Sequence, residues 1–236
     1  MKSTLLKTVP QTARRSSMAG SCVVAVRSGL LDARSQKIKR VTDILLALCL
    51  IVLALPLALA FAAAIVLETR GPVFFAHTRI GKGGRRFRMW KFRSMVVDAD
   101  VVLKKHLDKN REHLSEWLRT RKLKCDPRVT RVGWLLRRSS LDELPQLWNV
   151  LRGDMSMVGP RPIVQEEIAR YGPVFPLYSR VTPGLTGLWQ VSGRNDTSYR
   201  ERIALDAQYI RNWSLWGDLR VLLRTVRVVI CGHGAY

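Results

Sequence analysis

The sequence is poor in cysteine and in histidine. Its four cysteines lie far apart without a CxxC pair, and its four histidines form no cluster. Structural zinc sites usually use closely spaced cysteines and histidines, and small secreted domains usually carry a dense disulfide framework. The sequence therefore argues against both, and its cysteine usage is typical of a protein in a reducing compartment.

Acidic residues are also scarce. The 236 residues include 18 Asp and Glu against 40 Lys and Arg, which gives a net charge of +22. A charge of this size implies an anionic partner such as nucleic acid, acidic lipid or a phosphorylated substrate. The charge alone does not choose among these classes.

One segment, Ile44 to Leu67, contains no charged residue at all. A straight helix of 24 residues is about 36 Å long, enough to cross a bilayer core of roughly 30 Å. Pro56 near its midpoint favours a kink, and both flanks are basic, which favours placing both ends on the cytoplasmic side. We therefore predict a re-entrant helix hairpin broken at Pro56. A straight span and a buried soluble helix are the alternatives.

The chain divides into three parts. Residues 1–36 are rich in Ser, Thr, Arg and Ala and are predicted to form a mobile basic arm. The apolar segment starts too late in the chain for a cleavable signal peptide. Residues 37–70 contain the predicted membrane hairpin, and residues 71–236 the predicted cytosolic catalytic domain.

The third part is predicted to have an α+β, mostly helical fold. Val73–Phe75 and Phe87–Phe92 resemble two short strands, and Gly81–Gly84 between them is typical of a turn. A small β-hairpin is favoured over a phosphate-binding loop, because the Walker spacing is missing. Helical patterns follow at 98–124, 164–171, 200–213 and 215–230, with loops at 158–162 and 183–187; residues 129–138 carry arginines around a short apolar face. The last helix is amphipathic, so it either lies in a membrane interface or packs on the core.

An acidic pair, Asp142-Glu143, stands inside a basic region. Ser140 and Glu143 have the spacing of a helix capping box, and with Asp142 as the cap both acids would still lie in a first turn. A helix N-terminus and the neighbouring Arg137 and Arg138 would favour the ionised carboxylates. An ionised aspartate can attack phosphorus, and carboxylates suit Mg²⁺. With the membrane segment, the pair suggests phosphoryl transfer on a lipid; simple helix capping is the alternative.

Several longer motifs occur in a fixed order. They are Lys39–Asp43 before the apolar segment, Lys91–Met95, Ser140–Leu147, Gly153–Pro162, Pro183–Gly187 and Ser192–Asn195. From about Lys39 onward the chain resembles the bacterial sugar transferases, the monotopic polyprenyl-phosphate glycosyl-1-phosphate transferases. It is most similar to members that transfer galactose phosphate to undecaprenyl phosphate and initiate exopolysaccharide synthesis.

The resemblance implies an activity and its partners. Sugar-1-phosphate, with galactose or glucose as the sugar, would pass from a UDP-sugar to undecaprenyl phosphate through a covalent aspartyl intermediate, with release of UMP. It implies Mg²⁺ as cofactor, contact with anionic membrane lipid, and a place on the cytoplasmic face of the bacterial inner membrane. Nucleic acid is not an expected partner, and homodimer formation stays open. A non-catalytic, membrane-tethered protein that binds nucleic acid or lipid is the alternative function.

The resemblance also implies roles for single residues. Asp142 would be the nucleophile. Glu143 would assist it, either by holding Mg²⁺ or by tuning the protonation of the lipid phosphate, and these two acids are the implied metal ligands. The implied substrate- and phosphate-binding residues are Lys91, Arg93, Arg137, Arg161, Arg194 and Asp206. Pro56 matches the proline that breaks the re-entrant helix. Relatives often have Ser-Pro there, whereas this chain has Leu55-Pro56.

Overall fold

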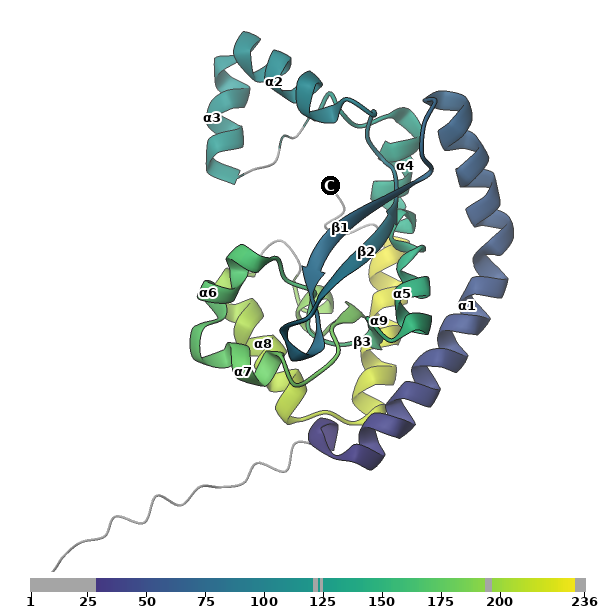
Figure 1. Ribbon diagram of the computed structural model, residues 1–236, viewed down its shortest axis with the longest axis vertical. Helices are drawn as coiled ribbons and strands as arrows, with labels where there is room; N and C mark the ends of the chain where they lie inside the picture. Colours follow the sequence, from purple (N-terminus) through teal and green to yellow (C-terminus); the bar gives the residue numbers. More distant parts are fainter. Residues whose placement is uncertain (1–28, 121–122, 124, 194–196, 232–236) are drawn as a thin grey trace, which may run out of the picture.

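The computed structural model describes residues 29–120, 123, 125–193 and 197–231 (Figure 1). Most of the predicted basic arm lies outside these residues. A 3-10 turn, η1 (Gly29–Leu31), precedes the first helix, and Leu30 within it is buried. Helix α1 then begins at Ala33, four residues before the predicted boundary, with the Asp32 carboxylate accepting a hydrogen bond from the Ser35 N–H.

Helix α1 (Ala33–Glu68) is a single 36-residue helix that contains Pro56. The structure has this one bowed helix in place of the two arms predicted around a break (Figure 1). A proline removes only one hydrogen bond of the helix, and the surrounding Leu and Ala residues are strong helix formers, so the helix continues through it. Its middle is exposed and apolar, as at Val52 and Leu53, which are 70% and 71% exposed. By length and composition, α1 could cross a membrane.

The N-terminal part of α1 is tied to the rest of the chain by polar contacts. The Arg40 guanidinium donates to the backbone carbonyls of Val150 and Leu151 at the end of α5 (Gln146–Arg152). The Lys39 ammonium lies 2.7 Å from the Asp218 carboxylate of α9 (Leu215–Cys231), and both side chains are buried. These contacts fix the direction in which α1 leaves the globular part of the chain.

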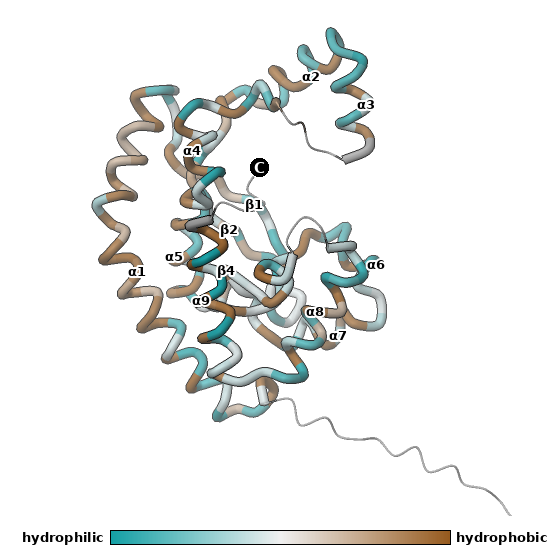
Figure 2. The backbone as a smooth tube through the Cα atoms, turned by 180° about the vertical axis from the view of Figure 1, so that it is seen from behind, coloured by the Kyte–Doolittle hydropathy of each residue, from teal (hydrophilic) through white to brown (hydrophobic). Residues whose placement is uncertain are grey.

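The C-terminal end of α1 returns to the same body. The Glu68 carboxylate accepts hydrogen bonds from the N–H groups of Arg131 and Val132, at 2.7 and 3.0 Å, in the first turn of α4 (Arg131–Ser139). Ile65 packs in an apolar cluster with Leu136. Both ends of α1 therefore contact one globular part, while the apolar middle stands away from it (Figure 2).

The predicted β-hairpin is confirmed. Strands β1 (Phe74–Ile80) and β2 (Arg86–Phe92) are antiparallel, with Phe74 opposite Phe92 and Ile80 opposite Arg86. The turn contains η2 (Lys82–Gly84), where Gly83 has φ of 70°. Glycine adopts this left-handed conformation without the steric cost that a side chain would bring.

A second, two-stranded parallel sheet was not predicted: one strand ends at Val158, where a predicted loop begins, and the other lies within the predicted loop 183–187. Strand β3 (Ser156–Val158) pairs with β4 (Gly184–Thr186). A Cβ atom on Gly184 would lie 2.1 Å from the backbone nitrogen of Gly159, so only glycine permits this approach. Three-residue strands are too short for an alternating pattern to identify, which explains why the sequence did not predict the pair.

The remaining elements are short helices around these strands. The predicted 98–124 helix is divided at Asn110 into α2 (Ala99–Lys109) and α3 (Arg111–Thr120), which project from the body (Figure 1). The other helical elements are η3 (Leu141–Glu143), η4 (Gln165–Glu167), α6 (Ile168–Tyr171), η5 (Gly172–Val174), α7 (Phe175–Tyr178), η6 (Trp189–Val191) and α8 (Tyr199–Arg211). The main core joins α5, β3, α8 and α9 through buried residues such as Val150, Val158, Ile210 and Val221.

Candidate active site

The acidic pair lies at a sharp turn between two helices. Helix α4 ends at Ser139, and Ser140 has φ of 57°, the left-handed conformation that terminates the helix. Asp142 then falls in η3, and Ser140 makes no capping hydrogen bond with its side chain. The side-chain hydrogen bond of the predicted capping box is therefore missing, but both acids lie in the first turn of η3, as predicted; the left-handed backbone at Ser140 ends α4 and directly precedes η3. The reversal leaves Asp142 beside strand β2.

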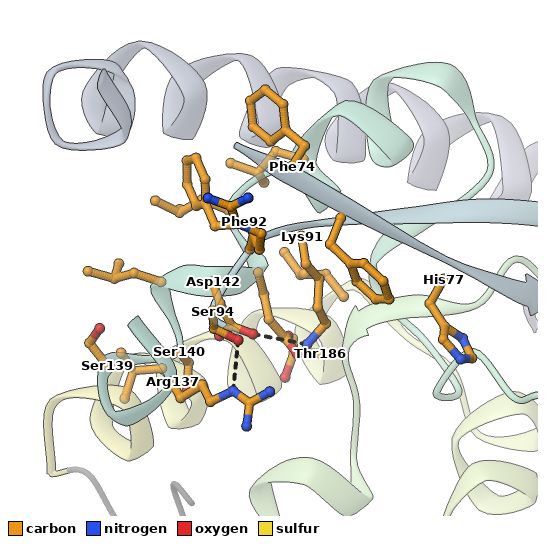
Figure 3. Close-up of a pocket in the computed structure, with 18 of the residues that line it drawn as sticks. Phe74, His77, Lys91, Phe92, Ser94, Arg137, Ser139, Ser140, Asp142 and Thr186 are labelled. Carbon is orange, nitrogen blue, oxygen red and sulfur yellow. Dashed lines mark hydrogen bonds and ion pairs between the residues drawn. The ribbon is translucent and has the colours of Figure 1, made fainter. Parts of the chain in front are cut away.

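Lys91 of strand β2 joins the two acids. Its ammonium nitrogen lies 3.2 Å from Asp142 Oδ2 and 2.7 Å from Glu143 Oε1. In Figure 3 the Lys91 side chain points down from the strand toward Asp142. Burial by itself would lower the pKa of Lys91, but the carboxylates of Glu143 and Asp142 raise it above its ordinary value. Lys91 therefore stays a cation and supplies positive charge where the two acids meet.

Asp142 is largely buried, and its burial raises the pKa of its carboxyl above the ordinary value. Lys91 opposes this shift, and the charge of Glu143 adds to it. The sequence predicted that a helix end and two arginines would favour the ionised form, but burial outweighs them. Arg138, one of the two arginines expected to act on the acids, stacks on Trp134, with its guanidinium carbon 5.1 Å from the ring centroid.

These groups open into a large cavity of about 1330 Å³. Its polar part contains the acid–lysine cluster and Arg137, whose Nε donates to Ser94 Oγ at 2.8 Å (Figure 3). Its apolar part is lined by α1 and α9, including Leu46, Leu50, Leu222 and Val226. The cavity therefore joins a charged end to an apolar end beside the membrane helix.

The structure brings most of the predicted site residues together. The residues of this set that line the large cavity are Lys91, Arg93, Arg137, Asp142, Glu143 and Arg161. Arg93 also ties the end of α1 to β2, because its guanidinium donates to the Thr69 hydroxyl at 2.8 Å. Asp206 lines a smaller cavity next to the large one. Arg194 lies outside the described residues, and Pro56 lies within α1 without breaking it.

Sequence reasoning assigned no role to two residues that line the large cavity, Trp189 and His77. Trp189 has two guanidinium carbons close to its ring, that of Arg202 at 4.6 Å and that of Arg161 at 5.4 Å from the centroid. Trp189 lies between the Pro183–Gly187 and Ser192–Asn195 motifs, and this position was the available signal. His77 is in β1, where it pairs with Met89 of β2, two residues along the strand from Phe75, which pairs with Lys91.

The acid pair could supply some, but not all, of the ligands of a divalent cation. Mg²⁺ commonly takes one or two protein carboxylates and completes its shell with substrate phosphates and water. Asp142 and Glu143 provide two such carboxylates at one end of the cavity. Among the described residues there is no group of three acids, histidines or cysteines that could hold a metal alone. A metal here would therefore need the phosphates of a substrate as further ligands.

The structure combines a helix that is long and apolar enough to cross a membrane with a cavity at one end of which a buried aspartate, a second acid and a lysine meet. A family model described as bacterial sugar transferase matches residues 34–232. The chain belongs to this family.

Three relatives show the extent of the similarity. The exopolysaccharide production protein ExoY of Rhizobium meliloti is 48% identical over 84% of this chain and 88% of the relative. The UDP-galactose-lipid carrier transferase of Erwinia amylovora is 46% identical, and the undecaprenyl-phosphate galactose phosphotransferase of Salmonella typhimurium is 44% identical, each over 91% of this chain. The chain spans 45% of the length of each of the latter two relatives.

Proposed function

We propose that the protein transfers a sugar-1-phosphate from a UDP-sugar to undecaprenyl phosphate at the membrane. The observation that carries the proposal is the contact of Lys91 with both Asp142 and Glu143 at the charged end of a cavity walled by α1. The names of the relatives support the same class of reaction, since two of them are called transferases of galactose to a lipid carrier.

In the first step, one carboxylate oxygen of Asp142 attacks the phosphorus that bears the sugar. The bond from this phosphorus to the bridging oxygen breaks, and UMP leaves with that oxygen. In the second step, a phosphate oxygen of undecaprenyl phosphate attacks the same phosphorus. The bond to Asp142 breaks, and the free carboxylate is regenerated with a lipid diphosphate sugar as product.

The cations around Asp142 have a defined task in both steps. Negative charge on the transferring phosphoryl group must be neutralised, and fixed cations do this without reorganisation during the reaction. Lys91, Arg137 and Arg161 line the same cavity as Asp142. Glu143 and Asp142 are the residues that would hold Mg²⁺, which when bound supplies further positive charge to the phosphates.

The lipid acceptor would enter through the apolar end of the cavity. Residues of α1 and α9 form this end, and the exposed apolar middle of α1 continues from it. Undecaprenyl phosphate has an apolar chain and a charged head, so its two ends match the two ends of the cavity. The distribution of charge thus orients the lipid phosphate toward Asp142.

The test of the function is release of UMP. Purified protein in nanodiscs with undecaprenyl phosphate should release UMP from UDP-galactose or UDP-glucose, and should release it catalytically only when the acceptor is present. A protein that binds DNA in a salt-dependent way but releases no UMP from any UDP-hexose would contradict the proposal and favour the binding-protein alternative.

We also propose that both ends of the unbroken helix α1 lie on the cytoplasmic side of the inner membrane, as in a re-entrant topology, with the catalytic part on the same face. Both ends of α1 contact the same globular part, through Arg40 at one end and Glu68 at the other. A helix that crosses the bilayer would have to separate these ends. In a cysteine-free background, single cysteines placed at Lys37 and Arg70 should both be shielded from a thiol reagent confined to the periplasm. Labelling at one of them alone would establish a straight crossing.

A further inference from the structure

A second, smaller cavity lies beside the large one. Its volume is about 160 Å³, and Arg161 and Trp189 line both cavities. The remaining lining residues are Ile163, Glu167, Tyr171, Tyr199, Arg202 and Asp206. The side cavity is therefore a polar compartment that shares a wall with the compartment of Asp142.

Asp206 supplies a buried acceptor to this side cavity. The residue is 1% exposed, and the Tyr171 hydroxyl donates to its Oδ2 at 2.7 Å. The backbone N–H of Arg161 also faces this carboxylate and lowers its pKa, but within the described part of the chain Oδ1 makes no hydrogen bond of normal geometry. A buried carboxylate oxygen without a well-formed hydrogen bond is costly, so a ligand that brings a hydroxyl donor would be stabilised here.

The charges of the side cavity favour a neutral ligand. Two arginines, Arg161 and Arg202, face two carboxylates, Glu167 and Asp206, among its lining residues. An anion would be attracted by the first pair and repelled by the second. The guanidinium groups of Arg161 and Arg202 both lie over the Trp189 ring. A nucleotide base that stacks on this ring would therefore have to displace one of them.

We propose that the side cavity binds the hexose ring of the donor and that Asp206 accepts a hydrogen bond from a hexose hydroxyl. This inference rests on the proposed function, because it places the attacked phosphorus beside Asp142. The hexose is joined to that phosphorus through a single oxygen, so its site must adjoin the large cavity, as the side cavity does through Arg161. The cavity volume is of the order of one pyranose ring.

The test separates the hexose from the rest of the donor. Binding of UDP-hexose and of UMP is measured by equilibrium dialysis at pH 8 on nanodisc protein carrying Asp142→Asn, so that no turnover occurs. Adding Asp206→Asn should weaken UDP-hexose binding about tenfold, since a charged acceptor is replaced by a neutral one. Binding of UMP, which has the same base and ribose but no hexose, should change by less than about twofold.

A milder variant keeps the test decisive where Asp206→Asn disturbs folding. Tyr199→Phe removes only one hydroxyl from the lining and should weaken UDP-hexose binding by roughly two- to tenfold without affecting UMP. Glu166→Gln is the matched control, because Glu166 is exposed and is not one of the lining residues of the side cavity. It should bind both ligands like the parent protein.

Two results would overturn the inference. Equal weakening of UDP-hexose and UMP would place the nucleotide, and not the hexose, in the side cavity. Unchanged binding in both Asp206→Asn and Tyr199→Phe would remove the cavity from donor recognition. Failure of the proposed function would look different: protein with native Asp142 would release no UMP from any UDP-hexose, whatever the binding results are.

Discussion

Two buried aspartates, Asp142 and Asp206, lie in neighbouring cavities and meet different partners. Lys91 lies within 3.2 Å of Asp142, which also borders the large cavity. Asp206 receives a hydrogen bond from the Tyr171 hydroxyl and lines a cavity of about 160 Å³. Burial raises the pKa of both carboxyls, and that of Asp206 rises to about 7.

The difference between these surroundings assigns the two acids to different tasks. A lysine beside a carboxylate favours its ionised form and leaves its oxygens able to attack. A tyrosine hydroxyl holds one oxygen of a carboxylate and leaves the other as an acceptor. Asp142 is therefore suited to bond formation, and Asp206 to hydrogen bonding with a ligand. The comparison predicts that equivalent substitutions at the two positions have unlike consequences.

The largest effect is expected for Asp142→Asn. An amide cannot form the covalent link to phosphorus, so UMP release should fall by at least about 10³-fold. Incubation of the native protein with a donor labelled in the sugar, without lipid acceptor, should give labelled polypeptide, and the variant should give none. The control is Asp108→Asn on the exposed side of α2, which should keep full activity. Undiminished turnover in Asp142→Asn would exclude this residue as the nucleophile.

Replacing Lys91 should have the next largest effect. Lys91→Met removes the cation that lowers the pKa of Asp142, so that pKa should rise further. Less of the nucleophile is then ionised at a given pH, and the acidic limb of kcat/KM should move to higher pH. The loss of a cation beside the phosphates should also reduce kcat about 10²-fold. Lys105→Met, at an exposed position of α2, is the control. An acidic limb that stays in place would contradict the pairing of Lys91 with Asp142.

Asp206 should affect stability more than chemistry as the pH changes. Its folded-state pKa of about 7 lies above the ordinary value of 3.8, so the folded protein binds this proton more tightly than the unfolded chain. The free energy of unfolding should therefore fall as the pH rises from about 4 through about 7. In Asp206→Asn this contribution disappears, and the loss of Tm between pH 5 and pH 8 should be smaller than in the parent. An identical pH dependence in both proteins would show that Asp206 does not titrate in this range.

The sequence predicted the elements that have strong local patterns. The β-hairpin follows from aromatic strand residues around Gly81–Gly84, and α9 follows from its amphipathic repeat. The motifs around Asp142 and Lys91 were both predicted to belong to one site, and the structure brings the two side chains together, although it was the fold that revealed their direct contact. These features are encoded within a few neighbouring residues, which is why they can be recognised without a structure.

What the sequence did not predict depends on contacts between distant segments. Burial of Asp142 arises from packing of β2, η3 and α5, so the rise of its pKa could not be derived from the neighbouring arginines. Strand β3 exists only because β4 lies beside it. The position of Asp206 in a side cavity requires Tyr171, which is 35 residues away in sequence. The continuity of α1 through Pro56 reflects strong helix formers outweighing one lost hydrogen bond.

The smallest expected effect is that of Tyr171→Phe, which alters the partner of Asp206 and leaves the acid in place. The variant loses the 2.7 Å hydrogen bond to Oδ2, which lowers the pKa of Asp206 in the native protein. That pKa should therefore rise further, and the loss of stability should extend to higher pH. A buried acceptor without its donor costs about 1–3 kcal/mol, equivalent to a drop in Tm of roughly 2–12 °C. The control is Tyr199→Phe in the same cavity, which should lower Tm less. An equal drop in both variants would mean that the Tyr171–Asp206 hydrogen bond does not contribute specifically to stability.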